Sequence, residues 1–233
     1  MQETVTKPAT KALLIYPQFN APSFWNYRAS CELLGARYPT APLGLMTVAA
    51  MLPADWDVCL IDCNTQSLDL ADIDRADIIM TGGMLPQQCA LLQIIDLCHS
   101  RGKPVVVGGP DVTSSPQIYD RADFQIRGEA ESVMPAFIAA WNSGARGGVF
   151  EGEKFQADVT TTPIPRFDLI RFQDYLYIGV QFPAVVLSIA SFATLSSFTG
   201  VCPAQRQYLR CSPNSTPYIA WGFVDTWIFQ TTT

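Results

Sequence analysis

Short apolar segments alternate with helical patterns through the first 145 residues, and several of these segments are followed directly by glycines. The first segment is a continuous apolar run, as expected of a strand buried on both faces of a sheet, and the others also read as strands. They span residues 12–16, 56–61, 77–81, 103–107 and 123–126. Helical spacing of apolar residues occupies 42–52, 85–100 and 131–141. Strands joined through helices pair in parallel, so we expect an α/β domain with a flavodoxin-like, doubly wound, five-stranded parallel sheet.

Glycine-containing turns follow three of the expected strands. Ligands of doubly wound sheets bind beyond the carboxyl ends of the strands, so these turns are candidate binding residues. Gly82-Gly83 follows the third strand, Gly108-Gly109-Pro110 the fourth, and Arg127-Gly128-Glu129 the fifth. Glycine lets the backbone approach a ligand closely, although tight turns alone would explain the same residues. Neither a GxGxxG fingerprint nor a P-loop is present. Asp111–Ser115 offers hydroxyls and amides for a polar ligand, or simply for capping a helix.

The amino-acid composition argues against several classes of function. The net charge is −6 and the isoelectric point is about 4.7, which argues against nucleic-acid binding. The single histidine, His99, falls at the end of the 85–100 helix, so a Ser-His-Asp triad or a histidine-rich metal site is not expected. The seven cysteines lack the spacing of a disulfide scaffold and suggest reduced thiols in a cytoplasmic protein. Residues 1–10 lack the apolar segment of a secretory signal and are expected to be disordered.

Five motifs carry a resemblance to a known family. They are Pro22-Ser23-Phe24-Trp25, Pro42-Leu43-Gly44-Leu45, Thr81-Gly82-Gly83-Met84, Val107-Gly108-Gly109-Pro110-Asp111 and Arg127-Gly128-Glu129-Ala130-Glu131. In this order they resemble the cobalamin-binding radical S-adenosylmethionine (SAM) proteins, in the subgroup that includes hopanoid methylases. The resemblance covers residues 11–182. It implies a cobalamin-binding domain over 11–145 and a linker over 146–182 that leads to a radical SAM core.

The resemblance also implies where cobalamin binds, across the carboxyl edge of the sheet with its nucleotide tail near the turns after 77–81 and 103–107. The implied binding residues are Leu43, Gly44, Thr81, Gly82, Gly83, Met84, Gly108, Gly109, Pro110, Asp111, Arg127, Gly128 and Glu129. Classical cobalamin modules supply a cobalt-binding histidine from a DxHxxG motif. The residues after the first strand, 17–22, read PQFNAP instead. A histidine ligand from this domain is therefore not expected, and the lower axial ligand stays unassigned.

The sequence departs from the family after Phe182. There the family has CxxxCxxC, whose thiolates hold the [4Fe–4S] cluster that binds SAM. Here Pro183–Gly200 reads PAVVLSIASFATLSSFTG, and the only charged residues from 183 onward are Arg206, Arg210 and Asp225. Cys202 and Cys211 are too widely spaced to supply three ligands. No catalytic or metal-binding residue is therefore predicted, and the chain alone is expected to be inactive.

A reading-frame change explains this departure. Codons compatible with residues 183–200, read with one base added in front, give SRGCPFDCEFCDIIELYG, which contains CxxxCxxC. We therefore expect residues 183–233 to be an out-of-frame, disordered tail. The alternative is a membrane span within 175–205, which is uncharged and long enough to cross a bilayer but is interrupted by Pro183. A flavodoxin-like or receiver-like signalling module is a further alternative, although 77–81 is followed by glycines and not by a phosphate-accepting aspartate.

Overall fold

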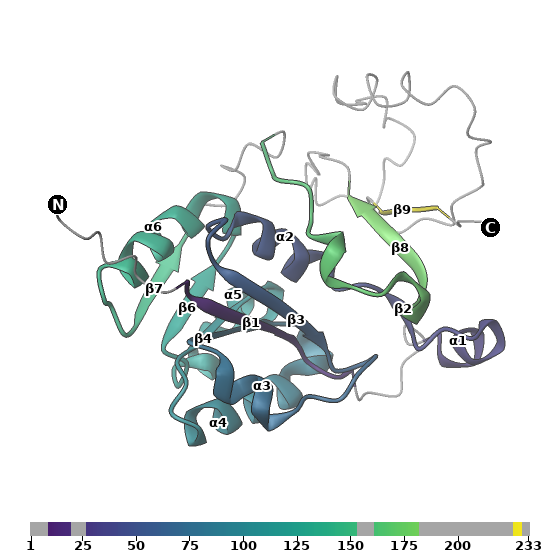
Figure 1. Cartoon of the computed structure of the whole chain (residues 1–233), viewed down its shortest axis with the longest axis horizontal. Helices are drawn as coiled ribbons and strands as arrows, with labels where there is room; N and C mark the ends of the chain where they lie inside the picture. Colours follow the sequence, from purple (N-terminus) through teal and green to yellow (C-terminus); the bar gives the residue numbers. More distant parts are fainter. Residues whose placement is uncertain (1–8, 20–26, 153–160, 182–225, 230–233) are drawn as a thin grey trace, which may run out of the picture.

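The computed structural model describes residues 9–19, 27–152, 161–181 and 226–229, which form a large and a small sheet (Figure 1). All strand pairs of the large sheet are parallel. Its six strands are β1 (Lys11–Tyr16), β3 (Asp57–Asp62), β4 (Ile78–Gly82), β5 (Val105–Gly108), β6 (Phe124–Arg127) and β7 (Gly148–Glu151). They lie in the order β3-β1-β4-β5-β6-β7.

This strand order confirms the predicted fold class. With β2 set aside, the order is that of a flavodoxin-like sheet, and the winding direction reverses between β1 and β4. The sheet has one strand more than the five expected. The additional strand, β7, lies within the range 146–182 that was expected to be a linker. It is a short edge strand with mostly exposed residues, so it lacks the apolar run that marks a buried strand.

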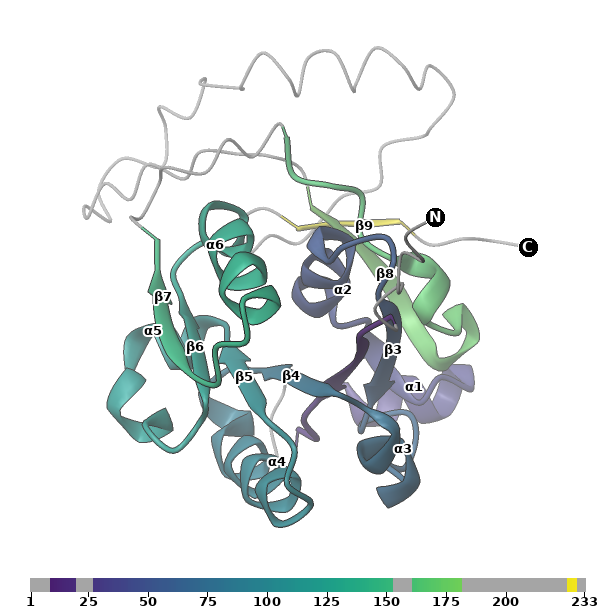
Figure 2. The same cartoon turned by 60° about the vertical axis from the view of Figure 1, so that its left-hand side comes forward.

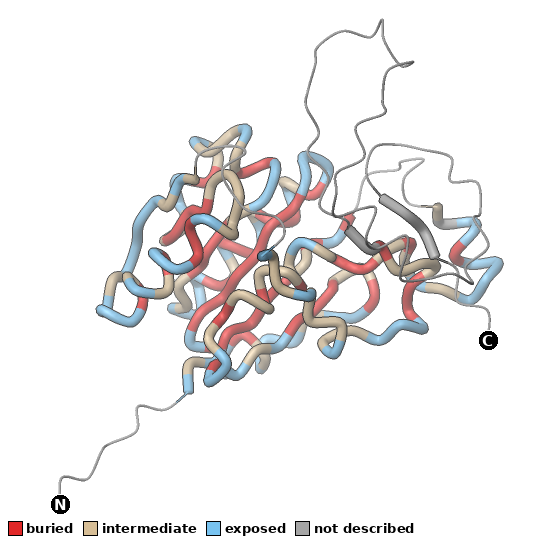
Figure 3. The backbone as a smooth tube through the Cα atoms, turned by 90° about the horizontal axis from the view of Figure 1, so that it is seen from above, coloured by how far each residue is buried: buried red, intermediate tan, exposed pale blue. Residues whose placement is uncertain are grey.

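Helices cover both faces of the sheet (Figure 2). On one face lie α2 (Leu43–Met51) and α6 (Ala130–Asn142). On the other lie α3 (Leu70–Arg75), α4 (Gln88–Ser100) and α5 (Pro110–Ser114). Successive residues of a strand point to opposite faces, so both faces of the central strands are buried. Ala12 and Leu14 of β1 accordingly pack in one core cluster and Leu13 and Ile15 in the other, and Figure 3 shows the strands as the buried centre of the molecule.

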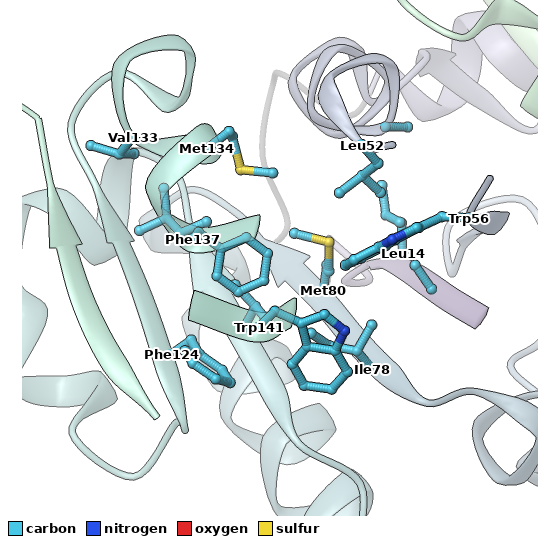
Figure 4. Packing of buried hydrophobic residues seen from close by; sticks show 14 of the residues in the cluster. Leu14, Leu52, Trp56, Ile78, Met80, Phe124, Val133, Met134, Phe137 and Trp141 are labelled. Carbon is cyan, nitrogen blue, oxygen red and sulfur yellow. The ribbon is translucent and has the colours of Figure 1, made fainter. Parts of the chain in front are cut away.

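Aromatic rings fill the core beneath α2 and α6 toward the amino edge of the sheet (Figure 4). The Phe124 ring meets the rings of Phe137 and Trp141 edge-on, with centroids 5.5 and 6.2 Å apart. Trp141 in turn lies 6.4 Å from Trp56, measured between ring centroids. Such edge-to-face pairs are favourable contacts between aromatic rings. This part of the interior is therefore closed, unlike the opposite edge of the same face.

The small sheet joins segments from distant parts of the chain. After α1 (Arg28–Leu34), β2 (Tyr38–Thr40) pairs in parallel with β8 (Tyr175–Gln181), and β8 pairs antiparallel with β9 (Thr226–Phe229). β9 falls within the range 183–233 that was expected to be disordered. The rest of that range, the motif 22–25 and most of the alternative membrane span 175–205 lie outside the described residues. Within the described ranges, no helix has the length and apolar character needed to cross a membrane.

Candidate functional site

A cavity of about 380 Å³ opens at the carboxyl edge of the large sheet, between α2 and the start of α6. Its floor is formed by Met80, Val106 and Ile126, one residue from each of β4, β5 and β6. The cavity lies near the reversal point between β1 and β4, where doubly wound sheets bind ligands. An apolar lining of this size suits the insertion of an apolar ligand group.

Most of the residues predicted from the sequence come together around this cavity. Ten of the thirteen line it: Leu43, Gly44, Thr81, Gly82, Gly83, Met84, Gly108, Gly109, Pro110 and Gly128. These residues come from α2 and from the ends of β4, β5 and β6, which the sheet places along one edge. The remaining three, Asp111, Arg127 and Glu129, do not line the cavity.

Gly44 leaves space that a side chain would occupy. It lies in the first turn of α2, on the same face as the cavity-lining residues Val48 and Met51. A Cβ added at Gly44 would meet no atom within 4 Å, and its backbone has no positive φ that would require glycine. Glycine in a helix costs roughly 0.5–1 kcal/mol relative to alanine. Packing within the described structure does not explain this residue, whereas a ligand in the cavity would.

The glycines in the turns after β4, β5 and β6 are also required by the conformation and packing of the backbone. A Cβ on Gly82 would lie 2.5 Å from the carbonyl oxygen of Gly108, so the ends of β4 and β5 could not pack as they do. Gly109 and Gly128 have φ angles of 97° and 78°, which favour glycine. These glycines therefore have two roles that are compatible: they form the turns, and they line the edge of the cavity.

The hydroxyl groups near the cavity are used within the protein. Thr81 lines the cavity, but its hydroxyl donates to the carbonyl of Ile15 at 2.8 Å. On α5, the hydroxyls of Thr113 and Ser114 donate back to the carbonyls of Gly109 and Pro110. The sequence suggested segment 111–115 as a source of polar ligand contacts. The hydroxyl protons of Thr113 and Ser114 are instead donated to backbone carbonyls of the protein.

The charged side chains of two predicted residues are held by hydrogen bonds within the protein. Asp111 is buried, and its carboxylate accepts hydrogen bonds from Gln88 Nε2 and the hydroxyl of Tyr119. Arg127 donates from Nε and from one terminal nitrogen to the side-chain oxygen of Gln125, at 3.0 and 2.8 Å. Asp111 therefore connects α4, α5 and the Tyr119 segment, and Arg127 is anchored on its own strand.

Two residues that sequence reasoning missed support the loop after β1. Gln87 is fully buried; its Nε2 donates to the carbonyl of Pro17 at 2.7 Å, and its side-chain oxygen accepts from the Met84 amide. Asn64 accepts from the Phe19 amide at 2.8 Å. Both residues thereby connect the loop after β1 to neighbouring strand ends. A lone amide residue in a turn carries no sequence signal for such a role.

A buried carboxylate lies at the end of β3. Asp62 is 1% exposed and accepts hydrogen bonds from the backbone and side-chain nitrogens of Asn64, at 2.8 and 2.7 Å. The hydroxyl of Tyr175 donates to its other oxygen at 2.9 Å. Burial raises the pKa of Asp62 above its usual value, although the hydrogen bonds from Asn64 and Tyr175 oppose this. The same burial, together with the nearby Asp62 carboxylate, raises the pKa of Tyr175.

Glu131, at the start of α6, is the one charged residue among the described residues that line the cavity, and it accepts a hydrogen bond from Thr162 at 3.2 Å. The single histidine of the chain lies elsewhere. His99 Nε2 is 2.8 Å from Asp123 Oδ2, and that oxygen also accepts from the Val105 amide at the amino end of β5. His99 is therefore at the amino edge of the sheet, opposite the cavity. In the described ranges, no group of three or more His, Cys, Asp or Glu residues could hold a metal ion.

Comparison with known proteins identifies the domain. Residues 33–138 match the B12 binding domain family. The chain is 40% identical over 174 residues to an uncharacterized methyltransferase of Synechocystis sp., covering 74% of this chain and 32% of that protein. It is 30% identical over 179 residues to the hopanoid C-2 methylase of Rhodopseudomonas palustris, covering 74% of this chain and 33% of the methylase. An uncharacterized methyltransferase of Pyrococcus horikoshii is 25% identical over 173 residues, covering 63% of this chain and 38% of that protein. No solved structure matches the chain.

These findings place the chain among proteins with a B12-binding domain, a class whose flavodoxin-like sheet agrees with the structure. Residues 33–138 are a B12-binding domain, and over 174 and 179 residues the chain is similar to an uncharacterized methyltransferase and to a hopanoid C-2 methylase, in agreement with the sequence motifs. The chain spans about a third of the length of the curated relatives that it matches.

Proposed function

We propose that this chain is the cobalamin-binding module of a radical SAM methylase and that it binds cobalamin without catalysing a reaction by itself. The observation that carries the proposal is the apolar cavity behind the glycine turns, within a domain that matches the B12 binding family. When bound, cobalamin would supply a methyl group that can be transferred. The residues of this chain would bind the cofactor, orient it and keep water from the part that is inserted.

The size and chemistry of the cavity fit part of the cofactor. A cavity of about 380 Å³ accommodates a group of modest size and is smaller than a complete cobalamin. The floor of Met80, Val106 and Ile126 suits the flat aromatic base of the nucleotide tail. The corrin ring would then lie over the turns formed by Gly82-Gly83 and Gly108-Gly109, where the absence of side chains allows close approach.

No histidine of this chain is available to the cobalt of a cofactor in this position. His99, the only histidine, is held by Asp123 at the amino edge of the sheet. The apolar residues around the cavity would thus hold the cofactor by its shape and its peripheral groups.

The proposed relation to radical SAM enzymes depends on a shift of the reading frame after residue 182. The methyltransferase alignments span 174 and 179 residues, close to the length of the segment 11–182 after which the expected CxxxCxxC is missing. We propose that one base was lost before the codon for Pro183. Sequencing the gene across codons 180–190 tests this directly: an extra base restores the motif, and a verified sequence without it refutes the frameshift.

Cofactor binding is tested with the purified chain and hydroxocobalamin. After gel filtration, the protein peak should keep the visible spectrum of the corrinoid in a stoichiometric amount. A parallel sample with flavin mononucleotide tests the flavodoxin-like alternative. A colourless protein peak refutes the proposal, and retention of flavin without cobalamin would favour the alternative.

A further inference from the structure

One hydroxyl group connects two of the glycine turns that line the cavity. Thr113 Oγ1 donates to the carbonyl oxygen of Gly109 at 2.9 Å and accepts from the backbone amide of Gly128 at 3.0 Å. Gly109 follows β5, and Gly128 follows β6. Thr113 lies on α5 and does not itself line the cavity. Thr113 thus contacts the turns that line the cavity without lining the cavity itself.

These two turns need support from outside themselves. Both glycines have a positive φ, and glycine has more backbone freedom than any other residue. The Gly109 carbonyl is held twice, because the Thr113 backbone amide also donates to it, at 3.0 Å. The Gly128 turn packs tightly against the exit of β7, where a Cβ on Gly128 would lie 2.7 Å from the Gly152 carbonyl oxygen. The hydroxyl of Thr113 therefore joins a turn fixed to α5 with a turn fixed to β7.

A neighbouring residue shows what an ordinary helical hydroxyl does. Serine and threonine in helices often donate to the carbonyl four residues earlier. Ser114 does this to Pro110 at 2.8 Å, and within the described ranges its hydroxyl accepts no hydrogen bond from another turn. Thr113 makes the same local bond and in addition accepts from Gly128. The second bond is what distinguishes Thr113 from Ser114.

We propose that Thr113 is a positioning residue of the cofactor site, whose hydroxyl fixes the separation of the Gly109 and Gly128 turns. This proposal rests on the proposed function, since it assigns the turns to cobalamin. Without the hydroxyl, the Gly128 amide loses its acceptor and the turn keeps only its packing against the end of β7, so its distance from the Gly109 turn can vary. The cofactor would then have to order the turn when it binds, which weakens binding.

The test compares three variants in hydroxocobalamin titrations. Thr113→Val removes the hydroxyl with little change of shape, and we expect the Kd to rise about tenfold, as for the loss of one hydrogen bond. Thr113→Ser keeps the hydroxyl and should bind within about threefold of the original chain. Ser114→Ala removes only the local bond on the same helix and should not change the Kd. If Thr113→Val does not fold, as judged by circular dichroism, Thr113→Ala makes the same comparison.

Hydrogen exchange of the Gly128 amide is the second readout, because it reports on the turn without cofactor. The amide should exchange faster in Thr113→Val than in Thr113→Ser or Ser114→Ala. If the original chain binds cobalamin and Thr113→Val binds equally well, the positioning role is refuted while the proposed function stands. If the original chain binds no cobalamin, both are refuted, even where the exchange data show that Thr113 holds the turn.

Discussion

The hydroxyl of Tyr175 donates a 2.9 Å hydrogen bond to the carboxylate of Asp62, although 113 residues separate the two in the sequence. Tyr175 begins β8 of the small sheet, and Asp62 ends β3 of the large sheet. A second connection lies beside it, because Arg37 pairs with Asp174 at 3.3 Å and donates to the Thr65 carbonyl. The segment that leaves the B12-binding domain is therefore fixed to the strand ends of that domain.

Removing the Tyr175 hydroxyl should loosen this connection. Tyr175→Phe leaves one oxygen of a buried carboxylate without its donor, which costs about 1–3 kcal/mol. Urea unfolding should show this loss, and the amides of β8 should exchange faster. Tyr177→Phe on the same strand is the matched control, because the described part of the chain gives that hydroxyl no hydrogen bond. Equal stability of the two variants would contradict the prediction.

The stability contribution of Asp62 should depend on pH. Its pKa in the folded chain lies above the ordinary value of 3.8, so the folded state holds the proton more tightly than the unfolded state does. This contribution is present below the ordinary pKa and is lost as the pH rises through the folded pKa. Relative to Asp62→Asn, the original chain should lose stability as the pH rises above about 4. Urea unfolding of both proteins at several pH values measures the difference, and an increase with pH would show that the sign is wrong.

Substitutions of Gly44 by larger residues should affect folding stability and cofactor binding differently. Gly44→Ala removes a helix-destabilising glycine where a Cβ has space, so it should raise the free energy of unfolding by roughly 0.5–1 kcal/mol. Gly44→Phe should keep the fold and reduce cobalamin binding at least tenfold by filling the cavity. Ala50→Leu, on α2 but outside the cavity lining, is the control for added bulk. Undiminished binding by Gly44→Phe would place the ligand elsewhere.

The free cysteines should differ widely in reactivity. Burial raises the pKa of Cys98 to about 12 and that of Cys63 to about 11, whereas Cys89 is exposed. Because the thiolate is the reactive form, alkylation with iodoacetamide at pH 8 should modify Cys89 well before Cys63 and Cys98. Mass spectrometry of the digested protein measures the order. Early modification of Cys98 in the folded chain would contradict its burial between α4 and the sheet.

The central sheet was predictable because its strands are buried on both faces. Short apolar runs bounded by turn residues, such as 77–81 and 103–107, indicate interior strands, and the glycines after them lie at the edge where the cavity opens. Short elements lacked such a signal. β7 is an exposed edge strand, and α3 and α5 have six and five residues, too few to show a helical period.

The parts of the candidate site that are lined by backbone were predictable from the sequence. The parts that depend on the orientation of side chains were less so. Glycine turns lie at the cavity because strand ends must meet at one edge. The direction in which Asp111 and Arg127 point depends on Tyr119, Gln88 and Gln125, which no local pattern connects to them. Motif resemblance therefore placed these two residues near the site, while tertiary contacts gave their side chains other partners.

The pairing of β2 with β8 limits how this module can be exchanged between enzymes. β2 lies between α1 and α2, inside the B12-binding domain, but its neighbour in the sheet comes from residues 175–181. A transplant that ended at residue 145 would leave the edge of β2 bare and deprive Asp62 of its tyrosine donor. Recombination that preserves folding should therefore fall after β8, so that the cofactor module and this distant strand are inherited as one unit.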